Sequence, residues 1–252
     1  MLLDLKTGIT YGPVRSRRLG RSLGINLLGS AAKVCTFDCL YCQYGWTPAA
    51  GIPHAEREGL PAPDEVLLAV ESALAALDEP PAYLTFSGNG EPTLHPRFGE
   101  IVDGVTAVRD RLAPAARTAV LSNSARVNEP SVRSALGRLD VRIMKLDAGT
   151  EATFRRFNRP IAGVTLAAVL EGLRALGGVT IQALFAQGPD GNAGTEEIRA
   201  WVDAVVSVKP IAVQIYTLAR GYPSEGIGPV GPRLLEAIRD RLVDLGVAAT
   251  VH

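Results

Sequence analysis

Three cysteines are the residues best suited to chemistry in this chain. Cys35, Cys39 and Cys42 are its only cysteines, and all three fall within eight residues. Three cysteines placed at random would cluster this tightly about once in a thousand chains. Thiolates at this spacing can bind an iron–sulfur cube, because soft sulfur ligands suit iron–sulfur clusters and zinc alike. A cube of four irons held by three cysteines keeps one iron open, which makes it a site for chemistry.

A zinc site is the alternative interpretation of the same residues. It would be of the Cys₃His type, with His54 or His95 as the fourth ligand. Zinc ligands usually come as two short pairs separated by a longer loop, whereas these three cysteines are consecutive. The spacing therefore favours a cluster and leaves zinc open.

A glycine-containing segment, Gly88–Pro92, is the second candidate site. Gly88 and Gly90 allow the backbone to approach a ligand closely, and Glu91 offers a carboxylate to a cation. A dinucleotide-binding fingerprint is the competing interpretation, but the segment lacks a third glycine and has Pro92 where a helix should begin. Taken alone, the segment is equally typical of an ordinary turn.

Polar side chains also mark the ends of two later expected strands. Asn123 follows one of them, and Lys145 and Asp147 end the next. Lysine and aspartate two residues apart lie on the same face of a strand. They are either ligand-binding groups inside the fold or a buried structural ion pair. Asn123 fits equally well as a cap of the segment that follows.

Short apolar runs alternate with helical patterns, which indicates an α/β fold. The expected strands cover residues 23–28, 82–87, 118–122, 141–147, 179–185 and 212–218, with a terminal strand over 247–251. The expected helices cover residues 64–77, 131–139, 165–176, 195–206 and 232–245. We predict a partial (β/α)₆ barrel of the TIM type, open on one side because closure takes eight units. Sites in such folds lie at the carboxyl ends of the strands.

Size and composition exclude several classes of protein. The 252 residues include 26 basic and 26 acidic side chains, and 47% of the residues are hydrophobic. A chain of this length buries roughly three quarters of its unfolded surface, so it needs no disulfide scaffold. We find neither a signal-peptide pattern nor an apolar run long enough to span a membrane. We expect one cytoplasmic domain over residues 1–252, with a basic segment over 1–22 and six β/α units over 23–252.

Positive charge is concentrated just before the first expected strand. Arg15, Arg17, Arg18 and Arg21 lie within seven residues of a chain whose net charge is zero. Zero net charge argues against nucleic-acid binding by bulk electrostatics but allows a local basic patch. One hypothesis places these arginines at the barrel mouth, where they bind phosphates of a nucleotide or an RNA. The alternative is a solvated or internally paired surface.

The pattern Cys-x₃-Cys-x₂-Cys, with Tyr41 before the last cysteine, resembles the signature of the radical S-adenosylmethionine (SAM) superfamily. The resemblance implies that Cys35, Cys39 and Cys42 bind one 4Fe–4S cluster whose open iron binds the amino and carboxylate groups of SAM. It also implies reductive cleavage of SAM to a 5′-deoxyadenosyl radical, which abstracts hydrogen from a substrate. An electron donor such as flavodoxin or ferredoxin is then required.

The resemblance extends to the other candidate residues. The segment from Gly88 is similar to the Gly-Gly-Glu-Pro motif that holds the methionine ammonium of SAM, with Asn89 in place of a glycine. By the same resemblance, Lys145 and Asp147 bind the ribose and the methionine carboxylate, and Lys145 joins the cysteines as a catalytic residue. The cofactor-binding residues implied are Tyr41, Gly88, Asn89, Gly90, Glu91, Asn123, Lys145, Asp147 and Ile215. Further candidate contacts to adenine or substrate are Gln182, Gln187, Gln214, Tyr216 and Thr217.

Four longer stretches, residues 16–26, 86–96, 145–160 and 214–220, resemble a bacterial group related to the wyosine-base (4-demethylwyosine) synthases, which rebuild a guanine in phenylalanine tRNA. Those synthases carry extra cysteines for a second cluster, whereas the three cysteines of this chain are all assigned to one cluster. Three function classes follow. The first is a radical enzyme acting on an unidentified substrate such as an RNA base or a small heterocycle, with tRNA or a nucleotide as candidate partner. The others are a glycyl-radical activase acting on a partner protein, and a non-enzymatic iron–sulfur or zinc module.

Overall fold

A computed structural model describes residues 1–16, 18–29, 31–48 and 59–252. The strands are β1 (Thr10–Ser16), β2 (Gly20–Ile25), β3 (Tyr83–Phe86), β4 (Arg117–Ser122), β5 (Val141–Lys145), β6 (Thr180–Gln187), β7 (Ala212–Thr217), β8 (Gly228–Pro229) and β9 (Ala249–Val251). The helices are α1 (Pro63–Ala75), α2 (Phe98–Leu112), α3 (Pro130–Gly137), α4 (Glu151–Thr153), α5 (Leu166–Leu176), α6 (Thr195–Val208) and α7 (Pro232–Asp244). A short 3₁₀ helix covers Pro92–Leu94, and a π-helical turn covers Phe154–Asn158.

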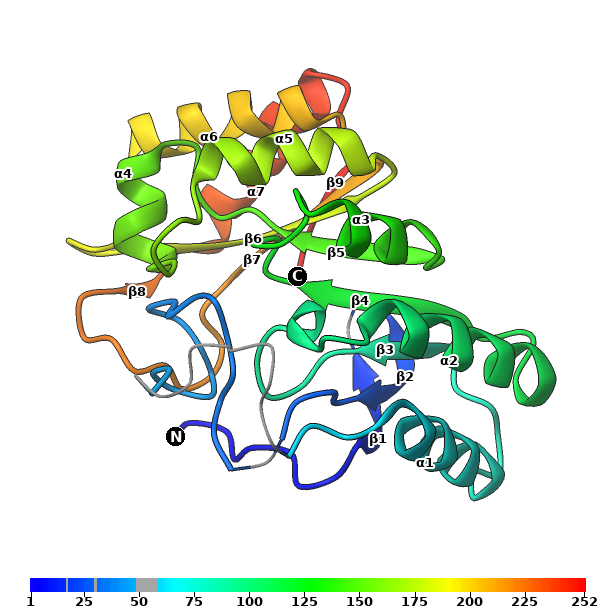
Figure 1. Ribbon diagram of the computed structural model, residues 1–252. Helices are drawn as coiled ribbons and strands as arrows, with labels where there is room; N and C mark the ends of the chain where they lie inside the picture. The colour runs from blue at the N-terminus through cyan, green and yellow to red at the C-terminus, as the bar shows by residue number, and fades with distance from the viewer. Residues whose placement is uncertain (17, 30, 49–58) are drawn as a thin grey trace.

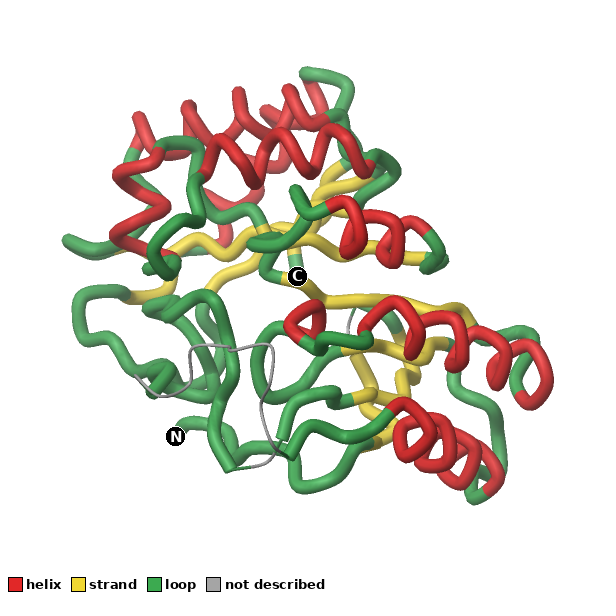
Figure 2. Tube along the Cα trace, in the orientation of Figure 1, coloured by secondary structure: helices red, strands yellow, loops and turns green. Residues whose placement is uncertain are grey.

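The sheet confirms the expected partial barrel. Strands β2 to β7 are parallel and lie side by side in chain order. Strand β9 adds to β7 in parallel, as expected for the terminal strand, and β8 pairs with β6. Among the described residues the sheet does not close on itself. The helices cover its outer face, and the loops that follow the strands gather at one end, beside the N terminus (Figures 1 and 2).

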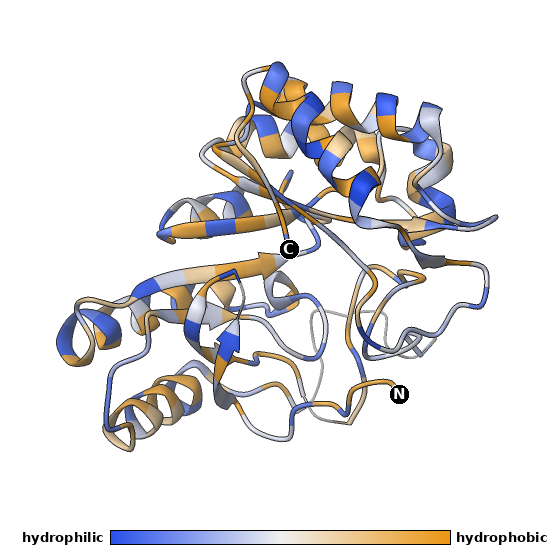
Figure 3. Ribbon diagram, turned by 180° about the vertical axis from the view of Figure 1, so that it is seen from behind, coloured by the Kyte–Doolittle hydropathy of each residue, from blue (hydrophilic) through white to orange (hydrophobic). Residues whose placement is uncertain are grey.

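Hydrophobic burial holds the helices against the sheet. The six longer helices, α1 to α3 and α5 to α7, bury apolar residues against the sheet and expose mainly polar ones (Figure 3). At the centre of the contact with α6, Trp201 is buried edge to face against Phe185 of β6, with 4.8 Å between the ring centroids. The Trp201 indole N–H donates to the carbonyl of Leu146, at 2.7 Å. This bond supports the chain between Lys145 and Asp147. No described helix has the length and apolar character needed to cross a bilayer.

Helix α2 lies between β3 and β4, where no helix was expected from the sequence. It buries Ile101, Val102 and Val105 on one face. Glycine weakens a helical pattern, and α2 contains Gly104 in its middle. The reason for glycine is tertiary, because a Cβ at this position would lie 2.7 Å from a methyl carbon of Leu67 in α1. The glycine therefore lets α1 and α2 approach closely.

Strand β1 lies within the basic segment expected over residues 1–22, for which no strand was expected from the sequence. It pairs antiparallel with β2, with an irregularity between Tyr11 and Val14. Pro13 interrupts the strand pattern in the sequence, and proline in a sheet is confined to edges and bulges. Strand β2 also starts three residues before the expected position and ends at Ile25. It ends there because the Asn26 side chain donates to the carbonyl of Leu28, at 2.6 Å, and turns the chain.

Replacing Trp201 by Phe should lower the free energy of unfolding by about 1–3 kcal/mol, because the Leu146 carbonyl loses its buried donor. Urea denaturation of the metal-free protein measures this change. The matched control is Leu68→Ala, since Leu68 is 65% exposed on α1 and should change stability by no more than about 0.5 kcal/mol. Equal effects of the two substitutions would contradict the assigned role of the indole N–H.

Candidate functional site

The loop that carries the cysteines is held between two other loops. On one side, Val34 forms a parallel bridge with Gly90: its N–H donates to the Asn89 carbonyl at 2.9 Å, and its carbonyl accepts from the Glu91 N–H at 3.0 Å. On the other side, the Leu40 N–H donates to the carbonyl of Phe157 in the π-helical turn, at 3.1 Å. These contacts bring the cysteine loop and the glycine segment together at the carboxyl ends of β2 and β3.

Hydrogen-bond donors are directed at two of the cysteine sulfurs. The Asn123 side-chain amide lies 3.4 Å from Cys35 Sγ, and that of Asn158 lies 3.6 Å from Cys39 Sγ. Burial raises the pKa of Cys35 and of Cys39 to about 12, with a further increase from nearby negative groups. Such thiols stay protonated at neutral pH unless a bound cation displaces the protons. Three thiols, two of them with amide donors at the sulfur, fit an iron–sulfur cluster.

The zinc alternative loses one of its two candidate histidine ligands. His95 Nε2 lies 3.0 Å from the carbonyl of Pro61, and His95 Nδ1 accepts from the N–H of Arg97. Both ring nitrogens are thus engaged by the backbone, so the suggestion of His95 as a fourth zinc ligand is wrong. His54 lies outside the described residues. In the described part of the chain, no three His, Cys, Asp or Glu side chains are grouped to hold a single metal ion.

The Glu91 carboxylate connects the glycine segment to the end of β4. One oxygen accepts from the hydroxyl of Thr93 at 2.7 Å and of Ser122 at 3.0 Å, and from the Thr93 N–H at 3.1 Å. The other accepts from the Asn123 N–H at 2.6 Å. Burial raises the pKa of Glu91, although these hydrogen bonds oppose the shift. With about four acceptor positions already engaged, the carboxylate orders the site itself. Its direct contact with SAM stays a prediction.

Asn89 turns away from the cysteine loop, which explains why this position is not glycine. Its side-chain amide donates to the carbonyls of Lys6, at 2.8 Å, and Gly29, at 3.2 Å. Its side-chain oxygen accepts from the Lys6 N–H at 2.7 Å. The Asn89 side chain, fully buried, thus fixes the chain before β1 against the glycine segment. This role was not predictable, because it depends on a contact between residues 83 positions apart.

Lys145 and Asp147 form a buried ion pair, with 2.8 Å between Nζ and Oδ1. Lys145 also donates to the hydroxyl of Tyr216 at 3.0 Å and lies between the Tyr41 and Tyr216 rings, 5.0 and 4.8 Å from their centroids. The other oxygen of Asp147 accepts from the Tyr41 hydroxyl and from Asn158. Burial acts to lower the pKa of Lys145, but Asp147 and Tyr216 outweigh it and the pKa is raised. The lysine is therefore a cation at neutral pH.

The remaining candidate residues differ in their surroundings. Gln182 donates to Gln214 at 3.1 Å, and Gln182 and Tyr216 face the same cavity inside the sheet. Ile215 is fully buried in the hydrophobic core, so contact with adenine stays a prediction for its backbone only. Gln187 is exposed at the edge formed with β8. The Thr217 hydroxyl bonds within the protein, to the Phe185 carbonyl.

Of the four arginines at positions 15 to 21, Arg15 and Arg18 line one cavity inside the sheet. Arg18 lies 4.4 Å from the ring centroid of Tyr216, inside the sheet. Arg21 pairs with exposed Glu79 at 3.2 Å and does not line that cavity. Arg17 lies outside the described residues. The structure adds Arg220, which reaches the cavity from the segment after β7 and was not among the basic residues predicted to bind phosphate.

A model of the Radical SAM superfamily matches residues 30–185, which include the cysteine loop, the glycine segment and the Lys145–Asp147 pair. The chain belongs to the radical SAM superfamily. A UPF0026 protein of Synechocystis sp. is 33% identical over 222 residues, covering 84% of this chain and 76% of that protein. In two other UPF0026 proteins, the matched region is about half of the whole, 49% and 50%.

Two solved structures share the fold. A radical SAM methyltransferase from Sphaerobacter thermophilus superposes with a TM-score of 0.65 at 13% identity, covering 92% of this chain and 65% of that one. A structure of TYW1 with a lysine–pyruvate adduct bound superposes with a TM-score of 0.59 at 13% identity, covering 89% of this chain and 73% of that one. At these identities the likeness concerns the fold, and the relation to wyosine-base synthases stays a prediction.

Lys33, which was not singled out in the sequence, is the buried cation of the cysteine loop. Its Nζ donates to the carbonyl of Gly45 at 2.7 Å and lies 3.7 Å from Asp38, and only 3% of the residue is exposed. It therefore ties the start of the loop to its end.

Lys33→Met should destabilise the metal-free protein by about 1–3 kcal/mol, because the Gly45 carbonyl and Asp38 lose their cation. Urea denaturation gives the value. Lys209→Met, at an exposed position after α6, is the matched control, expected to change stability by no more than about 0.5 kcal/mol. A neutral result for Lys33→Met would show that the loop is held without it.

Proposed function

We propose that this chain holds one 4Fe–4S cluster on Cys35, Cys39 and Cys42 and cleaves SAM reductively to start a radical reaction on a substrate. One observation carries the proposal: the cysteine loop, the glycine segment and the Lys145–Asp147 pair lie at the carboxyl ends of parallel strands and are bonded to one another. Superfamily membership supports enzymatic function over a non-enzymatic metal module.

The chain's own residues would bind and orient the two cofactors. When bound, the cluster supplies one electron that cleaves SAM to methionine and a 5′-deoxyadenosyl radical, which takes a hydrogen atom from the substrate. Asn123 and Asn158 donate toward the cysteine sulfurs, and hydrogen bonds to sulfur tune the reduction potential of a cluster. The backbone of Gly88–Glu91 would hold the methionine end of SAM. Glu91 fixes that backbone against β4.

We further propose an electron donor and a cellular location for the reaction. The reductant would be a low-potential carrier such as flavodoxin or ferredoxin, and the cytoplasm is the proposed location. Lys145 would meet the methionine carboxylate or the ribose of SAM from its position between the two tyrosine rings. This side chain is 15% exposed, which leaves part of it accessible to a ligand.

Anaerobic reconstitution should give about four irons per chain, the content of a single cubane. Replacing any one of Cys35, Cys39 and Cys42 by Ala should abolish formation of 5′-deoxyadenosine from SAM with dithionite as reductant, because each loss removes a cluster ligand. Iron analysis and chromatography of the products are the measurements. Stoichiometric zinc without iron-dependent colour would refute the cluster.

A pair of variants separates ligand binding by Lys145 from a purely structural role. Lys145→Met should destabilise the protein by about 3–5 kcal/mol, because Asp147 keeps a buried charge without its partner. The double variant Lys145→Met with Asp147→Asn removes both charges and should recover part of that stability. If Lys145 contacts SAM, calorimetry should still show SAM affinity at least about tenfold below wild type in the double variant. Wild-type affinity would assign the pair to structure alone.

A further inference from the structure

A cavity of about 330 Å³ lies between the inner face of the sheet and the N-terminal strand β1. Its floor consists of side chains from β2 to β6, among them Thr85, Leu121 and Gln182. Its other walls come from β1, from Tyr41 and Gln43 of the cysteine loop, and from the segment after β7 that ends at Arg220. The volume falls within the range of about 300–1,000 Å³ that is typical of small-molecule sites.

The lining of this cavity is positively charged. Lys6, Arg15, Arg18 and Arg220 contribute to it, and no aspartate or glutamate does. None of these four cations forms an ion pair within the described part of the chain, in contrast to Arg21, which pairs with Glu79 outside the cavity. Grouped cations without acidic partners repel one another and attract an anion.

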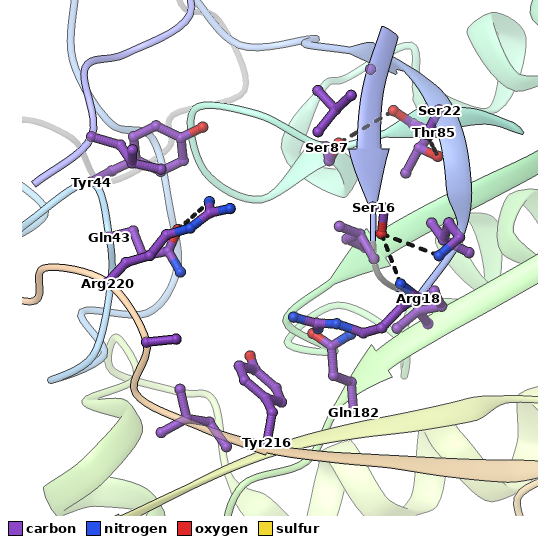
Figure 4. Close-up of a pocket in the computed structure, with 18 of the residues that line it drawn as sticks. Ser16, Arg18, Ser22, Gln43, Tyr44, Thr85, Ser87, Gln182, Tyr216 and Arg220 are labelled. Atoms are coloured by element: carbon purple, nitrogen blue, oxygen red, sulfur yellow. Dashed lines mark hydrogen bonds between the residues drawn. The ribbon is translucent and has the colours of Figure 1, made fainter. Parts of the chain in front are cut away.

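Two of the arginines that line the cavity keep N–H groups available to bind an anion. Arg18 stacks on the ring of Tyr216 and donates no side-chain hydrogen bond to a described residue, so the edges of its guanidinium are available. Arg220 donates one hydrogen bond, to Gln43 at 3.3 Å, and its other N–H groups are available to a ligand. The side chains of Arg18 and Arg220 extend into the cavity from opposite sides (Figure 4).

The cavity borders the proposed cofactor site and shares Tyr41 with it. Tyr41 and Tyr216, the two rings around Lys145, both line the cavity, and Ser87 lines it one residue before Gly88. The three cysteines, Glu91, Asn123 and Asp147 do not line it. A molecule held here would therefore lie beside SAM. Walls on several sides favour a small molecule over a folded RNA or a partner protein.

We propose that this cavity binds a phosphorylated small molecule, and that this molecule is the substrate of the radical reaction. Two guanidinium groups from opposite walls suit a doubly charged phosphate monoester, which accepts bidentate bonds from each. This inference rests on the proposed function for its reaction step. In that step one hydrogen atom leaves a C–H bond of the bound molecule for the 5′ carbon radical, which gives 5′-deoxyadenosine and a substrate carbon radical.

Ribose 5-phosphate and ribose form a matched pair of probes for the binding claim. Calorimetry on the cluster-loaded protein at low salt should show binding of ribose 5-phosphate and at least tenfold weaker binding of ribose. Arg18→Gln and Arg220→Gln should each weaken binding of the phosphate probe by roughly tenfold or more, as expected for one charged hydrogen-bonding group. Arg220 is exposed, so its variant tests the claim even if Arg18→Gln fails to fold. Arg21→Gln, the control, should leave phosphate binding unchanged.

Three results would overturn the inference. The first is equal binding of ribose and ribose 5-phosphate. The second is binding of succinate as tight as that of the phosphate probe and equally sensitive to Arg18→Gln, which would assign the site to carboxylates. The third is binding of tRNA by a protein that ignores the phosphate probe. Failure of the proposed function is distinct, because it appears as no 5′-deoxyadenosine from wild-type protein, SAM and dithionite, whatever the probes do.

Discussion

The close contact between Val34 and Gly90 is the constraint on which the site depends. A Cβ at Gly90 would lie 1.7 Å from the Val34 carbonyl oxygen, and the residue has a φ of +141°, so only glycine fits. The contact sets Cys35, the residue after Val34, against Glu91, the residue after Gly90. From there Glu91 reaches β4 through its carboxylate. Three strand ends are thus joined through one position without a side chain.

The Lys145–Asp147 pair fixes the other side of the cysteine loop against the end of β5. Burying two charges is costly unless they are paired and the remaining polar positions are bonded. Asp147 meets this condition by accepting from Tyr41 of the cysteine loop and from Asn158 of the π-helical turn. Asn158 in turn donates toward Cys39. The Asn158 amide that satisfies the buried Asp147 carboxylate therefore also contacts Cys39. The charge at the end of β5 is in this way linked to the position of a cysteine.

Local patterns were sufficient to predict most of the scaffold, and long-range contacts account for what was missed. Continuous apolar runs identified β2 to β7 within a few residues, and cysteine spacing located the loop, because both signals are local. Strand β1 was missed because Pro13 disrupts its pattern and its pairing with β2 is needed to see it. The same holds for Asn89, whose partner Lys6 is far away in sequence. No sequence pattern relates Arg220 to Arg18.

The cations around the cavity beside β1 differ from most other arginines of the chain in their partners. Elsewhere, arginines such as Arg109 and Arg126 are neutralised by nearby carboxylates. Lys6, Arg18 and Arg220 are instead gathered around one cavity without such partners among the described residues. An anion bound in this cavity would be attracted by these cations, and its binding would stabilise the folded chain. Arg15 lies in β1, and Lys6 and Arg18 lie in the segments on either side of it, so the N-terminal part of the chain supplies most of the positive charge around the cavity that we propose as a binding site.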